Sequence, residues 1–497
     1  MHRFIKLTAL CCVTVQAAFA QNITTVAGTG TRSFSGDGGQ ATAAAIANPY
    51  GVAVDASGNI YIADLANQRI RKVNTSGVIT TIAGTGSAGF SGDGGQATAA
   101  ALHDPVFVTV DGRGNVYISD VTNQRIRKVN GSGIITTVAG SGTVGFSGDG
   151  GQATNAAFAY PTGAVTDGIG NLYIADQSNN RIRKVDASGV VTTIAGTGSA
   201  GFSGDGGPAT AATMNQPYSM AVDGSGNVYI GDRNNSRIRK VTTSGVITTV
   251  AGNGGYGYSG DGGAATAATL NSPEGVVVDG SGNIYITDQY NARVRKVNAS
   301  GVISTVVGNG TSGYSGDGGA ATAAQIVYPG GLGVDVSGNL YIADLSGNSI
   351  RKVINSSVTN RVPSFFSGGY RFGMCQNSGT YNLNYLLRVR DVDTGQTLSW
   401  SLVSGPSHGT CSLSYSTTST GGTVMPAGLA YTPALDYNGL DSIKVRISDG
   451  AASGYITLTI TVFPTPSVAV ISGPASVCAG ESIALSSTET GGTWSTA

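Results

Sequence analysis

Short apolar runs recur four to a unit along residues 23–354, and polar turns separate them. One unit reads GVAV (51–54), IYIA (60–63), RIRKV (69–73) and VITTIA (78–83). Apolar residues fall on both faces of these runs, which predicts strands that are covered on two sides rather than on one. We therefore expect each unit to be a four-stranded antiparallel sheet.

The fourth run, ITTVAG at its first occurrence, returns five times with the step that separates Ile23 from Ile79. No copy has gained or lost a residue. A fixed period with four strands per copy is typical of a β-propeller blade, so the sequence predicts an all-β chain with a six-bladed ring. The copies begin at Ile23, Ile79, Ile135, Val191, Ile247 and Ile303.

The phase of the repeat leaves one strand displaced. ITTVAG stands before the first full unit, whereas the sixth unit ends after Val353 without a fourth strand. An open sheet edge invites pairing with other chains, and propellers avoid it by closing the ring. We expect residues 23–27 to pair beside residues 349–354 and to complete blade six.

Composition and the N-terminus indicate an exported β protein. The chain has 77 glycines, 11% charged residues and a net charge of zero, which describes a turn-rich protein rather than a nucleic-acid binder. Residues 1–20 carry Arg3 and Lys6, an apolar run and a small-x-small end, which is the pattern of a secretory signal peptide. No later stretch has the length of a membrane helix, so we expect no membrane insertion of the mature chain.

The segment 49–84, PYGVAVDASGNIYIADLANQRIRKVNTSGVITTIAG, resembles the NHL repeat, and all six copies over residues 23–354 share the likeness. The resemblance implies a propeller over residues 21–360. NHL propellers mostly bind protein, RNA or small ligands, and a minority, such as the peptidyl-glycine amidating lyase, are enzymes. The sixth copy departs from the pattern, with Gly347 and Ser349 where the others have Asn and Arg.

A long glycine-rich loop, such as residues 84–105, precedes each blade and ends in an Ala-rich piece such as QATAAAL (96–102). We expect the Ala-rich piece to form a short helix, with one apolar anchor that docks the loop on its blade. The anchors are Ile46, Leu102, Phe158, Met214, Leu270 and Ile326.

Long loops on a rigid scaffold are where binding surfaces usually lie, so the loops predict a ligand face for a sugar or peptide. Two alternatives stay open, because the aromatics can pack under their own loops and the aspartates can cap turns. The loop aromatics are Phe34, Phe90, Phe146, Phe202, Tyr258 and Tyr314. The loop aspartates are Asp37, Asp93, Asp149, Asp205, Asp261 and Asp317.

The third strand of each blade carries basic residues, Arg69, Arg71 and Lys72 in the first. Three repeated aspartates per blade balance these positive charges. No excess positive charge is left to bind phosphates, so we expect no nucleic-acid partner. We expect these side chains on a solvated or ion-paired outer face, away from the loops.

Catalytic chemistry has little support in the sequence. The mature chain has only His103 and His408, in different domains, whereas a Ser-His-Asp or three-His zinc site needs more convergent histidines. The alternative from another class is a propeller lyase or hydrolase with a metal-assisted site on the long-loop face.

The period stops after Pro363, and residues 364–463 predict a β-sandwich with strands at 383–389, 398–402, 442–447 and 455–462. The phrases DVDTGQTLSW, SGPSHGT and YTPALDYNGLDSIKVRISDG resemble bacterial cadherin-like and Ig-like surface modules. Residues 466–497 have the early strands of another Ig-like module, which we expect to be incomplete.

Two further sites are predicted in this region. The resemblance suggests calcium at a set of aspartates, although these residues can equally cap turns. Cys375 and Cys411 fall within one module and can form a disulfide, with Cys478 left over. The candidate calcium ligands are Asp391, Asp393, Asp436, Asp441 and Asp449.

Together these features predict a secreted or cell-surface scaffold of the bacterial envelope, non-enzymatic and without an obligatory cofactor. Its propeller would present a ligand face to an extracellular protein or glycan, and its Ig-like modules would act as a stalk.

Overall fold

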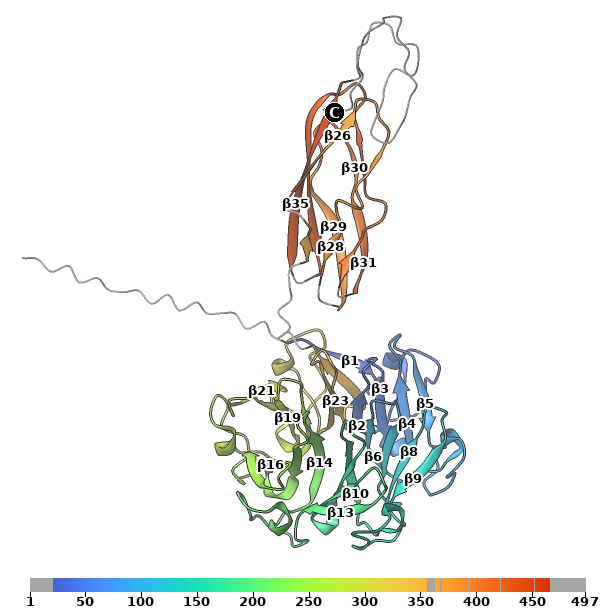
Figure 1. The fold of residues 1–497 in the computed structure, drawn as a ribbon, viewed down its shortest axis with the longest axis vertical. Helices are drawn as coiled ribbons and strands as arrows, with labels where there is room; N and C mark the ends of the chain where they lie inside the picture. The colour runs from blue at the N-terminus through green and yellow to red at the C-terminus, as the bar shows by residue number, and fades with distance from the viewer. Residues whose placement is uncertain are drawn as a thin grey trace, which may run out of the picture. The chain divides into compact units, whose positions relative to one another are not determined.

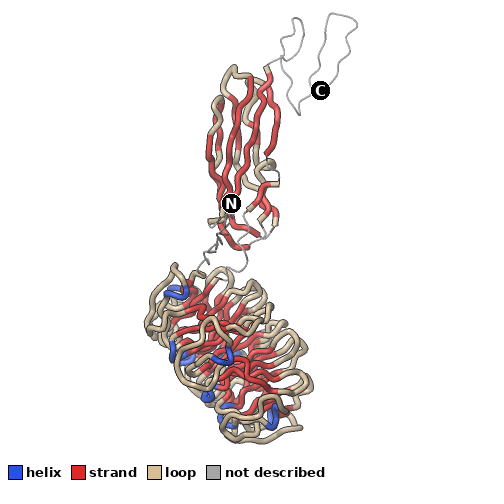
Figure 2. The backbone as a smooth tube through the Cα atoms, turned by 90° about the vertical axis from the view of Figure 1, so that its left-hand side faces the viewer, coloured by secondary structure: helices blue, strands red, loops and turns tan. Residues whose placement is uncertain are grey.

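The computed structural model describes residues 21–354, 363–366, 369–391, 394–420, 422–450 and 452–464. The chain divides into two compact units between Asn355 and Ser356, and both are all-β (Figures 1 and 2). The predicted signal peptide, 1–20, and the predicted incomplete module, 466–497, lie outside the described residues.

The first unit is a ring of six four-stranded antiparallel sheets. The first strand of each blade packs against the first strands of both neighbours, so these strands surround the axis (Figure 1). They are β2 (Pro49–Val54), β6 (Pro105–Val110), β10 (Pro161–Thr166), β14 (Pro217–Val222), β18 (Pro273–Val278) and β22 (Pro329–Val334). The second strands are β3 (Ile60–Asp64), β7 (Val116–Asp120), β11 (Leu172–Asp176), β15 (Val228–Asp232), β19 (Ile284–Asp288) and β23 (Leu340–Asp344).

The third and fourth strands lie farther from the axis. The third strands are β4 (Arg69–Val73), β8 (Arg125–Val129), β12 (Arg181–Val185), β16 (Arg237–Val241), β20 (Arg293–Val297) and β24 (Ser349–Val353). The fourth strands of the first five blades are β5 (Ile79–Ala83), β9 (Ile135–Ala139), β13 (Val191–Ala195), β17 (Ile247–Ala251) and β21 (Ile303–Val307).

The fourth strand of blade six is β1 (Ile23–Ala27), from the start of the described chain. It pairs antiparallel to β24, with Ile23 opposite Val353 and Thr25 opposite Arg351. Ile23 and Ala27 are fully buried. The predicted six-bladed ring with N-terminal strand closure is confirmed.

Six hydrophobic clusters of the ring each lie between two consecutive blades. One such cluster joins Tyr61 and Ile70 of blade one to Ile118 and Val129 of blade two. The apolar residues on both faces of the strands are therefore buried, as their pattern predicts.

The Ala-rich pieces form single turns of 3-10 helix rather than longer helices, since each spans only three residues. The six predicted anchors, Ile46 and its equivalents, are fully buried between blades. These turns are η1 (Ala41–Ala43), η3 (Ala97–Ala99), η4 (Ala153–Asn155), η6 (Ala209–Ala211), η8 (Ala265–Ala267) and η10 (Ala321–Ala323). A second set follows the second strands of blades one, three, four and five: η2 (Leu65–Asn67), η5 (Gln177–Asn179), η7 (Arg233–Asn235) and η9 (Gln289–Asn291).

The second unit has a five-stranded sheet in the order β26-β35-β34-β29-β31 and two three-stranded sheets, β27-β33-β30 and β25-β28-β32. Trp400 lies in its core and donates a hydrogen bond to the Leu387 carbonyl at 2.8 Å. The strands are β25 (Ser364–Phe365), β26 (Gly369–Cys375), β27 (Tyr381–Asn382), β28 (Val389–Arg390), β29 (Thr394–Ser404), β30 (Gly409–Ser412), β31 (Ser414–Thr420), β32 (Thr423–Val424), β33 (Ala430–Pro433), β34 (Gly439–Ser448) and β35 (Ser453–Phe463).

Three of the four strands expected in this unit are present, within β29, β34 and β35. The expected strand at 383–389 is wrong, because residues 384–387 form a turn in which the Leu387 amide donates to the Leu383 carbonyl at 3.0 Å. Both leucines are buried from that turn.

Removing β1 should open the ring. We expect a chain lacking residues 21–28 to melt at a lower temperature and to be cut by trypsin at Arg351 and Lys352 of β24, because these residues then lie on an edge strand. The single change Ile23→Ala should cost about 2 to 5 kcal/mol of the free energy of unfolding, as a buried cavity does.

Thr24→Ala, on the same strand at a partly exposed position, is the matched control. Equal melting temperatures and equal protease resistance for the shortened and intact chains would show that β1 does not close the ring.

Candidate functional site

Each blade holds one arginine, at the third position of its third strand, completely out of contact with solvent. Its charge is compensated by a loop aspartate, at 2.7 Å between Arg127 Nη2 and Asp93 Oδ1 in blade two. The carbonyl of Ser91, in the same loop, accepts a second hydrogen bond from this nitrogen at 3.0 Å. The buried arginines are Arg71, Arg127, Arg183, Arg239, Arg295 and Arg351.

A second aspartate, at the end of the second strand, lies on the other side of this guanidinium. Asp120 is fully buried and approaches Arg127 Nη1 at 3.3 Å. The amide of Asn123 donates to both oxygens of Asp120 and to the Gly89 carbonyl of the long loop. The turn aspartates that occupy this place are Asp64, Asp120, Asp176, Asp232, Asp288 and Asp344.

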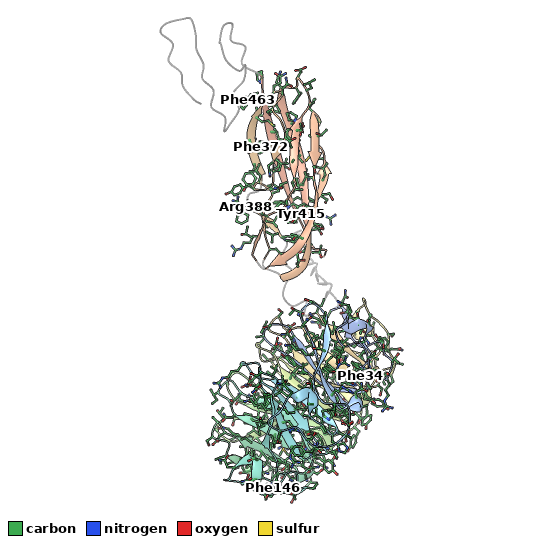
Figure 3. All side chains as sticks on the ribbon, turned by 90° about the vertical axis from the view of Figure 1, so that its right-hand side faces the viewer. Phe34, Phe146, Phe372, Arg388, Tyr415 and Phe463 are labelled. Atoms are coloured by element: carbon green, nitrogen blue, oxygen red, sulfur yellow. The ribbon has the colours of Figure 1, made fainter. Side chains whose placement is uncertain are left out.

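The loop aromatics lie against the same arginines. In blade two the Phe90 ring has the Arg125 guanidinium 3.8 Å from its centroid and the Arg127 guanidinium at 4.8 Å. The ring remains 42% exposed, and the other five loop aromatics are exposed to a similar extent. Figure 3 places Phe34 and Phe146 at the periphery of the propeller. Every loop aromatic therefore packs on its blade and keeps part of its ring in solvent.

The ion pairing expected for the basic stripe is present, but the expected placement away from the loops is wrong for the buried arginines. Arg71 and its equivalents are not on a solvated face, because the long loop folds over them and supplies their partners. The loop also pairs with the fourth strand of the following blade, where the Gly94 amide donates to the Ile135 carbonyl at 2.8 Å. The loops thus cover the outer edges of the blades instead of standing free.

Blade six lacks two members of this network. Gly347 has no side-chain amide for the turn aspartate, so only its backbone N–H donates to Asp344 Oδ1, at 3.2 Å, and Ser349 replaces the outer arginine. Asp344 Oδ2 accepts no hydrogen bond from the described residues, and Arg351 Nη1 lies 3.8 Å from it. Burial raises the pKa of Asp344 to about 6, against the opposing effects of the Val327 amide and Arg351.

Two of the positions that differ from blade to blade lie at one end of the ring, which we call the channel mouth. There the first strands begin and the second-to-third-strand turns lie. The residue after the proline is Tyr50, Val106, Thr162, Tyr218, Glu274 or Gly330. The residue after the turn aspartate is Leu65, Val121, Gln177, Arg233, Gln289 or Leu345.

Three aromatic rings close the middle of the channel mouth. Tyr50 lies 5.7 Å from Tyr218 and 5.8 Å from Phe107, measured between ring centroids. Val106 and Val121 are buried against them. Residues from blades one, two and four therefore meet across the axis.

Glu274 is a buried carboxylate beside this aromatic cluster. It accepts hydrogen bonds from the Tyr50 hydroxyl and from Gln289 Nε2, and its Oε1 lies 2.7 Å from Arg233 Nε. Burial raises the pKa of Glu274, although Arg233 and these hydrogen bonds oppose the shift. The Glu274 side chain is 1% exposed and that of Arg233 24%, so the pair reaches the surface only through the guanidinium.

The sequence interpretation missed Arg233 and Glu274. Their signal is a departure from the repeat, since each stands alone in its column when the six units are aligned at their common step. The interpretation concentrated on what the blades share, and the shared polar residues have structural partners.

The predicted calcium ligands do not converge in the described part of the second unit. Asp441 accepts hydrogen bonds from the Ser407 and His408 amides and from the Tyr431 hydroxyl. The Asp436 amide pairs with Asn377, and Asp449 accepts from the Ala452 amide. Asp391 is buried, and Asp393 lies outside the described residues. Throughout the described residues, no group of three His, Cys, Asp or Glu side chains could hold a metal ion.

The predicted disulfide between Cys375 and Cys411 is not shown. Cys375 is paired to Phe463 on β35, whereas Cys411 is paired to Tyr431 on β33, in a different sheet. Burial raises the pKa of the Cys411 thiol to about 11. Among the described residues there is also no helix long and apolar enough to cross a membrane.

Comparison with known families agrees with both parts of the predicted resemblance. Five overlapping segments, 2–91, 87–147, 142–203, 198–259 and 254–315, match a family model described as Teneurin NHL domain. Residues 373–462 match one described as Bacterial Ig domain. The NHL-type and Ig-like assignments are therefore confirmed.

The chain is similar to Teneurin-1 of Gallus gallus, with 32% identity over 291 residues that cover 50% of this chain and 11% of the relative. Teneurin-4 of Mus musculus is 31% identical over 289 residues, covering 50% of this chain and 10% of that protein. The chain thus spans about a tenth of the length of these relatives. A structural genomics protein of unknown function from Bacteroides thetaiotaomicron VPI-5482 shares the fold, with a TM-score of 0.51, 21% identity and coverage of 67% of this chain and 76% of that chain.

Breaking one buried ion pair should destabilise the ring strongly. We expect Arg127→Met to cost about 3 to 5 kcal/mol of unfolding free energy, because it leaves Asp120 buried without its charged partner. The matched control is Lys128→Met on the same strand, where a partly exposed ammonium lies 5.7 Å from the Tyr117 ring centroid. Chemical denaturation measures both, and equal losses would contradict a structural role for the buried arginines.

Asp344 should make stability depend on pH. Its pKa of about 6 lies above the ordinary value of 3.8, so between these values the folded chain binds more protons than the unfolded chain. Its contribution to the unfolding free energy therefore rises as the pH falls from 7 to 5 and is lost as the pH rises. We expect Asp344→Asn to remove this rise, measured by denaturation at each pH. Identical pH profiles for wild type and variant would refute the shift.

Proposed function

The chain belongs to the teneurin NHL-domain family through its propeller, and on that premise we propose that it is a secreted or cell-surface, non-enzymatic binding and adhesion scaffold. The propeller presents a ligand face to an extracellular glycan or protein. The bacterial Ig domain that follows serves as a stalk.

One observation carries this proposal: the six blades repeat the same scaffold but differ at the channel mouth. Positions such as Asp64, Arg71 and Asp37 recur in every copy, and each has its partner inside the blade. Mouth positions such as Glu274 and Arg233 occur once. A rigid ring that carries one individual surface suits the recognition of one kind of ligand.

The loop aromatics form a second proposed contact surface. Five of the rings have one side on an outer and a buried arginine, Tyr314 lies on the buried Arg351 alone, and all six rings are partly open to solvent. The six rings recur around the periphery, so a polymeric ligand on a surface could touch several of them at once. Repeated weak contacts of this kind raise capture through effective concentration rather than through the strength of any single contact.

An array of extracellular glycans and purified extracellular proteins tests this function with the secreted chain. We expect capture of at least one of these ligands, and weaker capture by the triple variant Phe90→Ser, Phe146→Ser and Phe202→Ser. The melting temperature of this variant should fall only modestly, because an exposed cation–π contact contributes about 0.5 to 1 kcal/mol.

The control is the triple variant Lys128→Ser, Lys184→Ser and Lys240→Ser. These partly exposed cations lie on the third strands of the same three blades. A wild-type chain that captures nothing on the array would contradict the proposed function. Undiminished capture by the phenylalanine variant would restrict the loop aromatics to loop packing.

A further inference from the structure

Three exposed tyrosines, at positions that vary between the copies, lie on one side of the channel mouth, at blades four to six. Tyr256 is 71% exposed, Tyr290 55% and Tyr328 41%. The Tyr290 and Tyr328 rings meet edge to face, with centroids 5.7 Å apart. The positions equivalent to Tyr290 hold Ala66, Thr122, Ser178, Asn234 and Ser346.

Arg233 lies between these tyrosines. The Tyr256 hydroxyl donates to the carbonyl of Asn234 at 3.3 Å, next to Arg233 in the chain. On the other side, Arg233 Nε donates to Ser272 Oγ at 3.0 Å, and the Tyr290 amide donates to the carbonyl of the adjacent Asn271 at 3.3 Å. Arg233 and the three tyrosines therefore form one continuous surface.

The guanidinium of Arg233 is anchored on its Nε side, and the side chain remains partly exposed to solvent. Its Nε contacts the buried Glu274 and Ser272, and its carbon lies 5.2 Å from the Tyr218 ring centroid. Among the described residues, none accepts a hydrogen bond from Nη1 or Nη2. A planar fork with its terminal nitrogens available is the geometry that binds a carboxylate through two hydrogen bonds.

The surroundings favour a sugar over a peptide as the carrier of that carboxylate. The surface consists of loops and of the turns that hold Arg233 and Tyr290, so it offers no strand edge for an extended peptide to join by β-augmentation. Tyrosine rings combine an apolar face with a polar hydroxyl, which suits the apolar faces and hydroxyl rims of sugar rings.

We propose that Arg233, Tyr290, Tyr328 and Tyr256 form a binding site for an acidic glycan, in which Arg233 holds the carboxylate of a uronic acid and the tyrosines contact the sugar rings. The site deepens the proposed binding function and rests on it. Glu274 is a positioning residue, because it fixes the Nε side of Arg233, whose side chain is 24% exposed.

Titration calorimetry in solution tests the site with the secreted chain and two short probes, hexagalacturonate and a neutral galactose hexaose. We expect binding of the acidic probe and at least tenfold weaker binding of the neutral one. Arg233→Lys should weaken binding of the acidic probe about tenfold while keeping a charge beside Glu274, and Tyr290→Ala should weaken it by a similar factor.

Two controls match the changes in chemistry and exposure. Arg113→Gln removes an exposed arginine from a turn of blade two that lies away from the mouth, and Tyr160→Ala removes a tyrosine, 45% exposed, from the position equivalent to Tyr328. Both should leave affinity for the acidic probe unchanged. Melting temperatures verify that every variant is folded.

The site is wrong if neither hexasaccharide binds, if both bind equally well, or if Arg233→Lys and Tyr290→Ala bind the acidic probe as the wild type does. Preference for an acidic peptide, such as hexaglutamate, would also overturn it. These outcomes are separable from the array result, because capture of another glycan or protein would sustain the proposed function without this site.

Discussion

The structure of every blade depends on a guanidinium that solvent does not reach. Transfer of such a charge out of water costs several kcal/mol, and here two aspartates and a loop carbonyl compensate for it. In blade two the loop aspartate precedes Arg127 by 34 residues and the turn aspartate by seven. Loop, turn and third strand are thus fixed to one another by a single side chain. Because an apolar core of the same volume can be equally stable, the ion pairs matter most for where the loop lies.

Blade six shows how the ring accommodates a break in this arrangement. Its fourth strand comes from the other end of the repeat region, and that strand takes up the contacts of the loop: the Thr25 amide donates to Asp317 at 3.1 Å, and Thr25 Oγ1 lies 2.7 Å from the Tyr314 hydroxyl. The Gly347 backbone N–H replaces the missing Asn side chain only at Oδ1, at 3.2 Å, and Arg351 Nη1 lies 3.8 Å from Oδ2, which leaves Asp344 with the poorest partners of the six turn aspartates. Closure therefore preserves the contacts between the fourth strand and the long loop better than the hydrogen bonds of the turn aspartate.

The period predicts the ring, its closure and its anchors, because these depend on contacts that every copy makes alike. It does not predict the burial of Arg71, since alternation along RIRKV says nothing about a loop that returns from 34 residues away. The error at 383–389 has a local cause. Leu383 and Leu387 are four residues apart and face the core together from a turn, so their helical spacing outweighs the apolar composition that suggested a strand.

Packing alone requires the blades to differ near the axis, where equivalent side chains would otherwise meet. Tyr50, Phe107 and Tyr218 share that space, and a Cβ on Gly51 would lie 2.8 Å from the Phe107 Cα. This requirement accounts for departures that point inward and bury their side chains. It does not account for Tyr256 or Tyr290, which remain mostly exposed, nor for the unbonded fork of Arg233. Exposed departures from the repeat have no packing constraint to satisfy, which is the physical reason for placing the proposed site at this rim.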